Sequence, residues 1–525
     1  MSGNGRTTGG VRLAELVAAL SLGIDLGFGQ PMEHVLRQCL IALRLAERSG
    51  LDQESRADVY YTALLVNVGC HSDAHEQAKW FGDDLSLKSS KYKHGMHGVR
   101  ATASGMRSLG GTGNPPLHRF RVGLEFAISG HRELDDMVTH HANVARSLAE
   151  QLSLPATVQE ALGAAYEQWD GKGWPKGLKR DGVPVASRIA QFAEFVEVAH
   201  RVGGIAGATA VARKRSGTQF DPNLAKLLNA HAKEILDDLD SVQTWDAVIE
   251  AEPTLTVVLS DEQFDVALRA ISTFVDLKSP YMLGHSEAVA DLAAAAGSGM
   301  KMPAGDIQLL RRAALVHDFG RLGVSNAIWD KKGPLGPGEW ERVRMHPYIT
   351  ERMLHQSGTL SPVGALAVTI GERIDGSGYP RGISGAAISR TARVLAAADV
   401  YQAMLEPRPH RPARAPDEAA DELRSEVRSG RLEGDAVEAV LIAAGHRVRR
   451  RKEGVAGLTG REVEVLRLLA QGLSTKEIGE RLVMSPKTAS NHIEHIYTKI
   501  DASNRATASL FAVQHGLLPE WEPAR

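Results

Sequence analysis

Residues Ala313-Ala314-Leu315-Val316-His317-Asp318-Phe319-Gly320 form the stretch from which the rest of the chain is interpreted. Small and apolar residues lead into an adjacent His and Asp, and a Gly follows two places after the Asp. A nitrogen ligand beside a carboxylate, at the end of an apolar helical run, suits a divalent metal that accepts both donor types. Such a pair is common in proteins without a metal, so the interpretation depends on further ligands.

Further candidate ligands lie far away in sequence, each in its own apolar, helix-forming segment. His285 precedes His317 by 32 residues, and Asp399 follows Asp318 by 81 residues. Four ligands from three segments can converge inside a helical bundle, where metal sites are commonly built. We therefore predict that these four residues bind one metal ion.

Together with other motifs, this quartet resembles the HD phosphohydrolase superfamily. Asp375-Gly376-Ser377-Gly378-Tyr379-Pro380 is similar to the signature loop of its HD-GYP branch. His346-Pro347, Arg393 and Arg408-Pro409-His410-Arg411 also fall where that family has them, so the resemblance covers roughly 260–445. It implies a helical bundle with one divalent ion (Mn, Fe, Mg or Zn) in the quartet, and His346 as a further ligand.

The resemblance also implies roles in phosphate chemistry. A bound ion polarises a phosphoryl oxygen and lowers the pKa of a water molecule. We assign the catalytic roles to His317, Asp318 and Arg321. We expect Arg381 and Arg393 to bind phosphate, because a guanidinium group binds phosphate oxygens bidentately. Active members of the branch have Lys where this chain has Arg321.

Two departures from the HD-GYP pattern limit the expected chemistry. Ile370-Gly371 stands where the branch has two adjacent His, and Tyr281 stands where it often has Glu. In the branch those His, with the residue equivalent to His346, complete a second metal site, so we do not expect hydrolysis of cyclic di-GMP through two metals. A single-metal phosphohydrolase, a catalytically silent fold that binds nucleotide or metal, and a purely structural role all stay open.

The same unit occurs twice in the chain. Residues 62–69 mirror 313–320 at an offset of 251, and His34 mirrors His285 at the same offset. Later landmarks follow at an offset of 205: His141 with His346, the 170–175 loop with 375–380, Arg188 with Arg393, and Glu194 with Asp399. The first copy therefore contains 46 extra residues between about Cys70 and His141.

The first copy differs where chemistry would occur. Val66-Asn67 stands in place of His-Asp, and Glu194 in place of Asp399. Because Val cannot bind a metal and Asn is a weak ligand, we expect this copy to have lost the metal and to serve as a ligand sensor or a packing partner. We interpret the remaining pair His140-His141 as a solvated helix face.

Composition narrows the class of protein. The 525 residues correspond to about three domains, and an aromatic content of only 5% favours aliphatic, helical cores. A net charge of −2 provides no global attraction to nucleic acid. The two cysteines, Cys39 and Cys70, suit buried thiols in a reducing cytoplasm. No apolar run reaches the roughly 18–20 residues that span a bilayer, so we expect no membrane partner.

The C-terminal segment has the spacing of a helix-turn-helix. Thr459-Gly460-Arg461-Glu462 predicts a capping box, and Val463, Leu466 and Leu469 then repeat at helical spacing until Gly472. Ser474 or Thr475 begins a second helix, and Ser485-Pro486 begins a third.

Over about 457–518 this segment resembles the LuxR-type DNA-binding domain, through Leu458-Thr459, Lys476-Glu477-Ile478, Ser485-Pro486-Lys487-Thr488 and Asn491-His492. The resemblance implies that the third helix enters the major groove and that a fourth helix, Asn504 to His515, pairs two protomers. The implied DNA-binding residues are Lys476, Lys487, Thr488, Ser490, Asn491, His492 and Lys499. With 8 Lys/Arg and 7 Asp/Glu over 452–518, a single module should bind weakly, so we expect a homodimer.

Together these observations predict an all-α chain: two HD-type helical bundles followed by a four-helix helix-turn-helix domain. The predicted boundaries are 11–251 for the degenerate copy, 252–446 for the copy with the quartet, 447–456 for a basic linker, and 457–520 for the last domain. We expect a cytoplasmic transcription regulator on double-stranded DNA whose tandem senses or processes a phosphate-bearing small molecule. The alternative is a metal-dependent phosphohydrolase of nucleotides or cyclic dinucleotides with a DNA-binding regulatory module.

Overall fold

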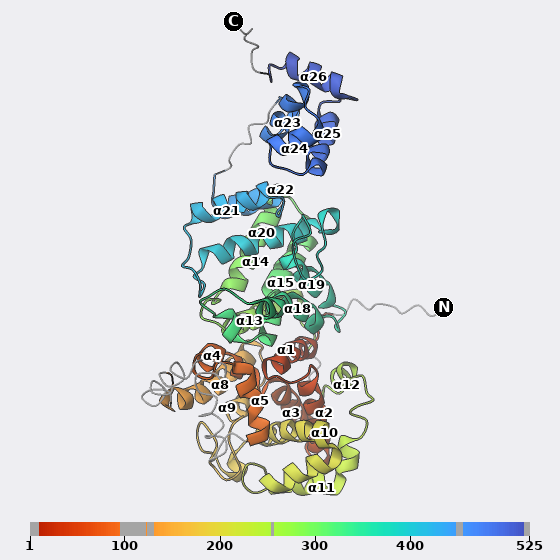
Figure 1. Cartoon of the computed structure of the whole chain (residues 1–525). Coiled ribbons are helices and arrows are strands. Elements are labelled where there is room, and N and C mark those ends of the chain that lie inside the picture. Colours follow the sequence, from red (N-terminus) through yellow and green to blue (C-terminus); the bar gives the residue numbers. More distant parts are fainter. Residues whose placement is uncertain (1–9, 95–121, 123–130, 254–256, 448–454, 519–525) are drawn as a thin grey trace, which may run out of the picture. The chain divides into compact units, whose positions relative to one another are not determined.

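The computed structural model describes residues 10–94, 122, 131–253, 257–447 and 455–518. Within these ranges the chain is all-α, as predicted: it contains helices and three isolated β-bridges but no named strand. The chain divides into two compact units, residues 1–446 and 447–525 (Figure 1). None of the described helices combines the length and the apolarity needed to cross a membrane.

The N-terminal unit contains both copies. Helices of the first copy are α1 (Leu13–Gly27), α2 (His34–Arg48), α3 (Gln53–Leu65), η1 (Val68–His71), α4 (Ala74–Phe81), α5 (Asp84–His94), α8 (His131–Gln151), α9 (Ala156–Gly163), η3 (Arg180–Gly182), α10 (Val185–Arg215), α11 (Pro222–Leu236) and α12 (Thr244–Glu250). Those of the second are α13 (Asp261–Asp276), α14 (His285–Gly299), α15 (Ala304–Val316), η4 (Phe319–Gly323), α16 (Asn326–Trp329), α17 (Pro337–Arg344), α18 (His346–Leu354), α19 (Ser361–Ala367), η5 (Val368–Gly371), η6 (Gly385–Ala387), α20 (Arg390–Leu405), α21 (Pro416–Arg428) and α22 (Gly434–Ala443).

The two copies repeat the same order of elements around equivalent residues. His34 begins α2 and His285 begins α14, and each follows a residue in the left-handed region, Glu33 (φ 78°) or Gly284 (φ 77°). A short 3₁₀ helix follows α3 in the first copy and α15 in the second. The duplication seen in the sequence is therefore also present in the fold.

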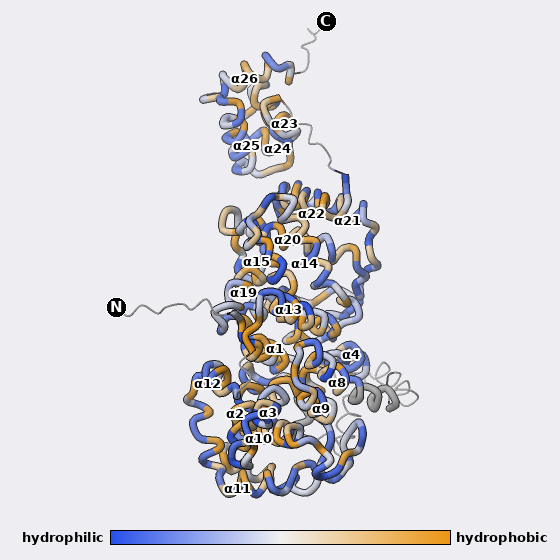
Figure 2. The backbone as a smooth tube through the Cα atoms, turned by 180° about the vertical axis from the view of Figure 1, so that it is seen from behind, coloured by the Kyte–Doolittle hydropathy of each residue, from blue (hydrophilic) through white to orange (hydrophobic). Residues whose placement is uncertain are grey.

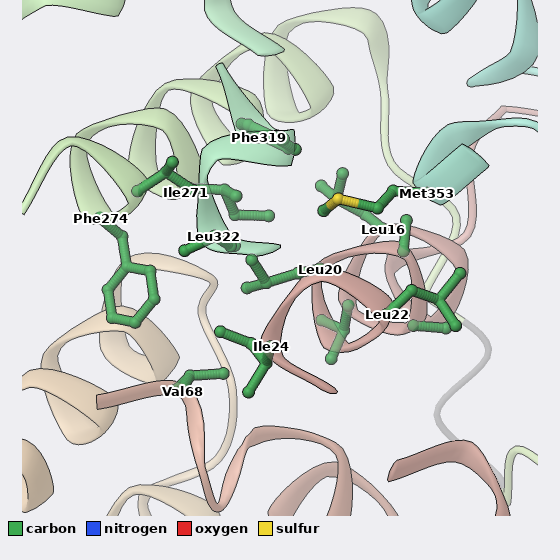
Figure 3. Packing of buried hydrophobic residues seen from close by; sticks show 14 of the residues in the cluster. Leu16, Leu20, Leu22, Ile24, Val68, Ile271, Phe274, Phe319, Leu322 and Met353 are labelled. Atoms are coloured by element: carbon green, nitrogen blue, oxygen red, sulfur yellow. The ribbon is translucent and has the colours of Figure 1, made fainter. Parts of the chain in front are cut away.

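Each copy's first helix packs against the other copy. α1 contacts η4 and α18 of the second copy, whereas α13 contacts α8 of the first. Figure 2 shows α1 as a largely hydrophobic helix, and Figure 3 shows its Leu20 and Ile24 beside Leu322 of η4. One hydrophobic core extends from Val11 to Leu441 through both copies. Because apolar burial is the main stabilising term in folding, the stability of each copy depends on the other.

A close backbone approach fixes the chain directly after the His317-Asp318 motif. A Cβ atom on Gly320 would overlap the carbonyl oxygen of His346, and one on Gly69 would overlap that of His141. Only glycine allows η4 and α18, or η1 and α8, to come so close. The Gly two places after the Asp therefore brings His346 next to Asp318.

The C-terminal unit is a small helical domain with its own core. It contains η7 (Val455–Gly457), α23 (Gly460–Ala470), α24 (Thr475–Arg481), α25 (Pro486–Lys499) and α26 (Arg505–Gln514). The predicted capping box is confirmed, because Thr459 Oγ1 accepts the Glu462 N–H (3.2 Å) and Glu462 accepts the Thr459 N–H (2.7 Å). Ser474 and Ser485 cap the next two helices.

Candidate metal centre and DNA-binding surface

Three histidines of the second copy turn the same ring nitrogen toward one point. His317 Nδ1 lies 2.6 Å from the Ala314 carbonyl oxygen, and His346 Nδ1 lies 2.7 Å from that of Val343. His285 Nδ1 lies 2.9 Å from the Glu406 carboxylate. Because a carbonyl or carboxylate at Nδ1 fixes the tautomer with the proton there, each Nε2 is left as a ligand atom.

Two carboxylates meet these nitrogens. Asp399 Oδ1 lies 3.2 Å from His285 Nε2 and 3.8 Å from His317 Nε2. Asp318 Oδ2 lies 3.5 Å from His317 Nε2, and its Oδ1 lies 3.5 Å from His346 Nε2. The structure thus brings together all four residues of the predicted quartet, and His346 as well. Ligands that share one ion at about 2.1 Å are separated by comparable distances.

The donor set fits a metal ion better than a hydrogen-bonded cluster. His317 Nε2 is buried and has no hydrogen-bond partner, and unpaired buried polar atoms are rare. Ligand atoms of His285, His317 and Asp318 all lie within 4.8 Å of one another. A divalent cation would satisfy the unpaired nitrogen and both carboxylates at once.

The electrostatics of the cluster keep its carboxylates ionised. Burial alone would raise the pKa of Asp318, but His317 and Arg321 hold it well below its usual range. Burial is likewise opposed at Asp399, whose pKa is lowered by the hydrogen bond from His285 and by the charge of His317. Burial lowers the pKa of His346, whereas the carboxylates raise the pKa of His285 to about 9 and also raise that of His317. A metal ion at this site must therefore displace protons from His285 and His317.

The cluster lies on the wall of a cavity of about 710 Å³. The cationic residues of its lining are Arg321, Lys331, Lys332, Arg373, Arg408 and Arg411, and the aromatic ones are Trp329, Trp340 and Tyr379. The Arg321 guanidinium lies over the Trp329 ring at 3.7 Å. Cations bind phosphate oxygens, and aromatic faces stack with planar bases. The cavity therefore has the chemistry to bind a phosphate-bearing nucleotide.

Two arginines that we expected at the phosphates lie elsewhere. Arg381 binds both oxygens of Glu351 (2.5 and 2.7 Å) in an exposed ion pair, and Arg393 donates to the carbonyls of Ile388 and Gly385 (both 3.0 Å). Neither belongs to the cavity lining. Sequence spacing shows that these arginines are near the signature loop but not which acceptors they find there.

Two functional candidates were not singled out from the sequence. Glu406 orients His285, and Arg408 binds Glu406 (2.9 Å) and the Tyr281 carbonyl (2.5 Å) at the cavity edge. The available signal was the position of Glu406, seven residues after Asp399 and directly after the end of α20, because residues i and i+7 share a helix face. The Arg408–Arg411 run was noticed only as part of a family pattern.

The lining includes the two residues on which the prediction of a single metal rests. Ile370 and Gly371 stand beside the cavity, and a Cβ on Gly371 would lie 2.8 Å from both Tyr379 Cε2 and the Tyr379 carbonyl oxygen. The aromatic ring of the signature loop thus occupies the space that a larger side chain at position 371 would need.

Just before the signature loop of each copy, a buried glutamate accepts hydrogen bonds from backbone N–H groups that follow the loop. Glu372 accepts the N–H groups of Arg381 (2.8 Å) and Ile383 (3.0 Å). At the equivalent place Glu167 accepts those of Lys176 (2.6 Å) and Leu178 (2.9 Å). Part of the loop's role is therefore structural, since it is held in the same way where the His-Asp pair is absent.

In the first copy, hydrogen-bond donors face the residue equivalent to Asp399. Asn67 Nδ2 and the Tyr92 hydroxyl both donate to Glu194 Oε1, at 2.8 and 2.9 Å. Tyr92 belongs to α5, within the 46 extra residues, and its ring meets that of His34 edge to face. At the place where candidate ligand atoms lie together in the second copy, the first copy has groups that donate hydrogen bonds to a carboxylate.

The interpretation of His140-His141 as a solvated face is wrong for His141. His140 is exposed, but His141 is buried at 6% exposure and pairs with Asp73. The reason is the close approach of η1 to α8 at Gly69, which draws this histidine into the core.

The predicted DNA-binding residues fall into two groups. On α25, Ala489 and Ile496 are buried, whereas Lys487, Thr488 and Asn491 are exposed on the opposite face. Lys476 on α24 is exposed, and Ser490 and His492 are half-buried. This arrangement gives α25 one polar, solvent-facing side, as a helix that enters a groove requires.

Lys499 does not belong to that side. Its ammonium group binds both oxygens of Glu462 (2.9 and 2.8 Å), the buried residue of the capping box. Burial lowers the pKa of His492, so its ring is neutral and provides little attraction for phosphate. The structure thus gives Lys499 a role in joining α25 to α23, which its place in the family motif did not indicate.

Comparisons with known proteins agree with this geometry. Residues 131–224 and 269–435 match the HD domain family, once in each copy. The 3'3'-cGAMP-specific phosphodiesterase 3 of Vibrio cholerae serotype O1 is 30% identical over 411 residues, which cover 78% of this chain and 89% of the relative. The chain belongs to the HD-domain family. Residues 456–512 match the family of bacterial regulatory proteins described as luxR.

Other members of the HD-domain family are similar over shorter or longer parts. A cyclic di-GMP phosphodiesterase of Thermotoga maritima is 36% identical over 160 residues, 30% of this chain and 43% of the relative. A crystal structure of a cyclic GMP-AMP-specific phosphodiesterase of V. cholerae superposes with a TM-score of 0.58 at 26% identity, covering 84% of this chain and 99% of that one. The all-helical tandem is therefore shared with a solved HD-domain protein.

Proposed function

We propose that this chain is a DNA-binding transcription regulator whose second HD copy binds a 3'3'-linked cyclic dinucleotide and hydrolyses it with the help of one divalent metal ion. One observation carries the proposal: three imidazole Nε2 atoms and two carboxylates meet beside a cavity lined by cations and aromatic rings. The substrate class is suggested by the V. cholerae relative, most of whose length aligns with this chain.

The chain's own residues divide the chemistry between them. His285, His317, Asp318 and Asp399 would hold the ion, and the mixed nitrogen and oxygen donors suit Mn, Fe or Zn better than Mg. When bound, such an ion polarises a phosphoryl oxygen and lowers the pKa of water toward neutrality. Arg321, Arg408, Trp329 and Tyr379 all line the cavity. In this proposal the two arginines would bind phosphate oxygens, and the two aromatic rings would stack with the bases.

A receptor without turnover is the second candidate, favoured by Ile370-Gly371 and the packing of Tyr379. In that case the cavity binds the dinucleotide and the regulator responds to occupancy alone. Both candidates require the metal-binding cluster, but only the first requires product formation.

The test separates these candidates. Elemental analysis of the purified protein, followed by assays with 3'3'-cGAMP and cyclic di-GMP, is compared with His317→Ala/Asp318→Ala. We expect about one metal equivalent and metal-dependent hydrolysis, both lost in the double variant. Arg381→Ala is the matched control outside the cavity and should retain full turnover. Tight binding without turnover would favour the receptor, and failure to bind either metal or dinucleotide would contradict both candidates.

The DNA-binding part of the proposal is tested on α25. Replacing Lys487 and Asn491 with Ala removes two exposed groups of its solvent-facing side and should abolish operator binding in electrophoretic mobility shifts, without a change in thermal midpoint. Lys499→Ala should instead lower that midpoint, because Glu462 then loses its partner. Unchanged DNA affinity in the double variant would contradict the assignment of α25 to the groove.

A further inference from the structure

Asp84 is a carboxylate of the first copy that is buried against the second copy. It begins α5, within the 46 residues that the second copy lacks, and its side chain has no exposed surface. Its Oδ1 accepts the hydroxyl of Ser325 (2.7 Å) and the N–H of Asn326 (2.9 Å). Both of these donors belong to the second copy, 241 and 242 positions away.

The turn that Asp84 binds carries one wall of the cavity. Ser325 and Asn326 join η4, which provides Arg321, to α16, which provides Ile328 and Trp329. The stacked Arg321 and Trp329 side chains cover this wall, and Trp329 meets the His346 ring edge to face at 5.5 Å. A shift of the turn would therefore move the cation and the ring that face a ligand.

The far end of α16 is bound from the same side. His75 Nδ1 of α4 lies 2.8 Å from Oδ2 of Asp330, the residue that follows α16. Asn326 Nδ2 donates to Asp330 as well (2.8 Å). Both ends of this four-residue helix thus contact side chains of the first copy, and a helix so short has little stability of its own.

Charge makes the contact specific for a carboxylate. Asp84 Oδ2 lies 3.4 Å from Lys88 Nζ of its own helix and 3.5 Å from Lys278 Nζ of the second copy. Burial would raise the pKa of Asp84, but Lys278 and Lys88 hold it at about 2. An uncharged replacement leaves two buried ammonium groups without their counter-ion, which is costly.

We propose that Asp84 is a positioning residue for the cavity of the other copy: it holds the Ser325–Asn326 turn so that Arg321 and Trp329 face the ligand. This inference rests on the proposed function for its ligand, but not for its geometry. The first copy thereby contributes to substrate recognition without touching the substrate.

The test compares Asp84→Ala and Asp84→Asn with Asp83→Ala in the full chain. Asp83 is the matched control, because it accepts the Leu85 N–H (3.1 Å) at the same end of α5. Amide hydrogen exchange followed by mass spectrometry should show faster exchange confined to residues 321–330 in Asp84→Ala. A smaller effect is expected in Asp84→Asn, which keeps the acceptor oxygen, and none in Asp83→Ala.

A second readout concerns the ligand. Asp84→Ala should raise KM, or Kd, for 3'3'-cGAMP on the order of tenfold, as expected for the loss of one ordered recognition group, and leave bound metal unchanged. Unchanged exchange at 321–330 would overturn the inference. Exchange that rises across the whole unit, in both Asp84 variants, would also overturn it, because Asp84 would then only stabilise the fold. Faster exchange confined to residues 321–330, in a protein that shows no turnover, would contradict the proposed hydrolysis but not the positioning role of Asp84.

Discussion

At the scale of single residues, each of the three histidines of the candidate metal centre is oriented by the group that its Nδ1 atom contacts. His317 and His346 use backbone carbonyls, which the fold provides, whereas His285 uses the side chain of Glu406. Carboxylates in this position raise the basicity of a ligand and fix its ring. Glu406 is therefore the orienting group that a single substitution can remove.

Replacing Glu406 with Ala should weaken metal binding by about 10–100-fold, the usual effect of losing such a partner. Calorimetric titration of the metal-free protein with Mn²⁺ measures this directly. Glu426→Ala serves as the control, because Glu426 binds Arg431 and is not part of the cavity lining. Equal affinity in the two variants would show that His285 is oriented without Glu406.

A second residue-level prediction concerns the pair of His34 and Glu197 in the first copy. Burial lowers the pKa of His34, but its bond to Glu197 outweighs this and raises it above 6.5, while His34 and the nearby arginines lower that of Glu197 below 4.5. The stability that the pair contributes is thus fully present between about pH 4.5 and 6.5. It is lost as pH rises through the raised pKa of His34, or falls through the lowered pKa of Glu197.

The thermal midpoint of His34→Asn, compared with wild type by scanning calorimetry across pH 5–9, checks this. The deficit of the variant should be largest near pH 6 and should shrink toward pH 9. A deficit that is constant with pH would mean that the pair contributes through packing, not charge.

Individual residues also show which features of the site could be predicted from the sequence and which could not. The proximity of His285, His317, Asp318 and Asp399 was predicted from the sequence, because each residue type and its helical setting are local properties. Arg381, Arg393 and Lys499 were misplaced because a long side chain chooses among acceptors that only the folded chain brings near, here Glu351, two loop carbonyls and Glu462. The same reason kept Asp84 hidden, since its partners lie in the other copy.

At the scale of elements, the contact between η4 and α18 sets the geometry of the site. Gly320 donates its N–H to Thr350 Oγ1 (2.9 Å), and Thr350 in turn donates to the His317 carbonyl (3.0 Å). The helix-forming pattern of each segment could be predicted from the sequence. The packing of α1 and α13, each against the other copy, could not be predicted, because an apolar helix face does not determine which element covers it.

Gly320→Ala should therefore destabilise the N-terminal unit by about 1–3 kcal/mol or more, since the new methyl group overlaps the His346 carbonyl. Metal binding should weaken with it, because α18 must retreat and move His346. Gly299→Ala is the matched control: it lies at the end of α14 with nothing within 4 Å of an added Cβ. Chemical denaturation of the three proteins gives the comparison, and equal stability of both variants would disprove the close approach.

At the scale of the whole molecule, ligand binding in the cavity can affect DNA binding only through contacts that lead to the end of the N-terminal unit. α20 carries Asp399 and, one half-turn on, Tyr401, whose hydroxyl lies 2.7 Å from Nε2 of His446. His446 is the last residue of the N-terminal unit. One helix therefore connects Asp399 of the candidate metal centre with the last residue of the N-terminal unit.

We expect Tyr401→Phe to reduce the effect of 3'3'-cGAMP on operator affinity while leaving each binding event intact. Coupling is the ratio of DNA dissociation constants with and without dinucleotide, and it is informative only if both are measured at one salt concentration. The His317→Ala/Asp318→Ala variant gives the ratio expected without coupling. The ratio for Tyr401→Phe should lie closer to that value than the wild-type ratio does. Tyr348→Phe, which alters a hydroxyl on a 40% exposed residue, should keep the wild-type ratio. A full ratio in Tyr401→Phe would mean that α20 and His446 do not carry the signal, since the shared bond would have been removed without consequence.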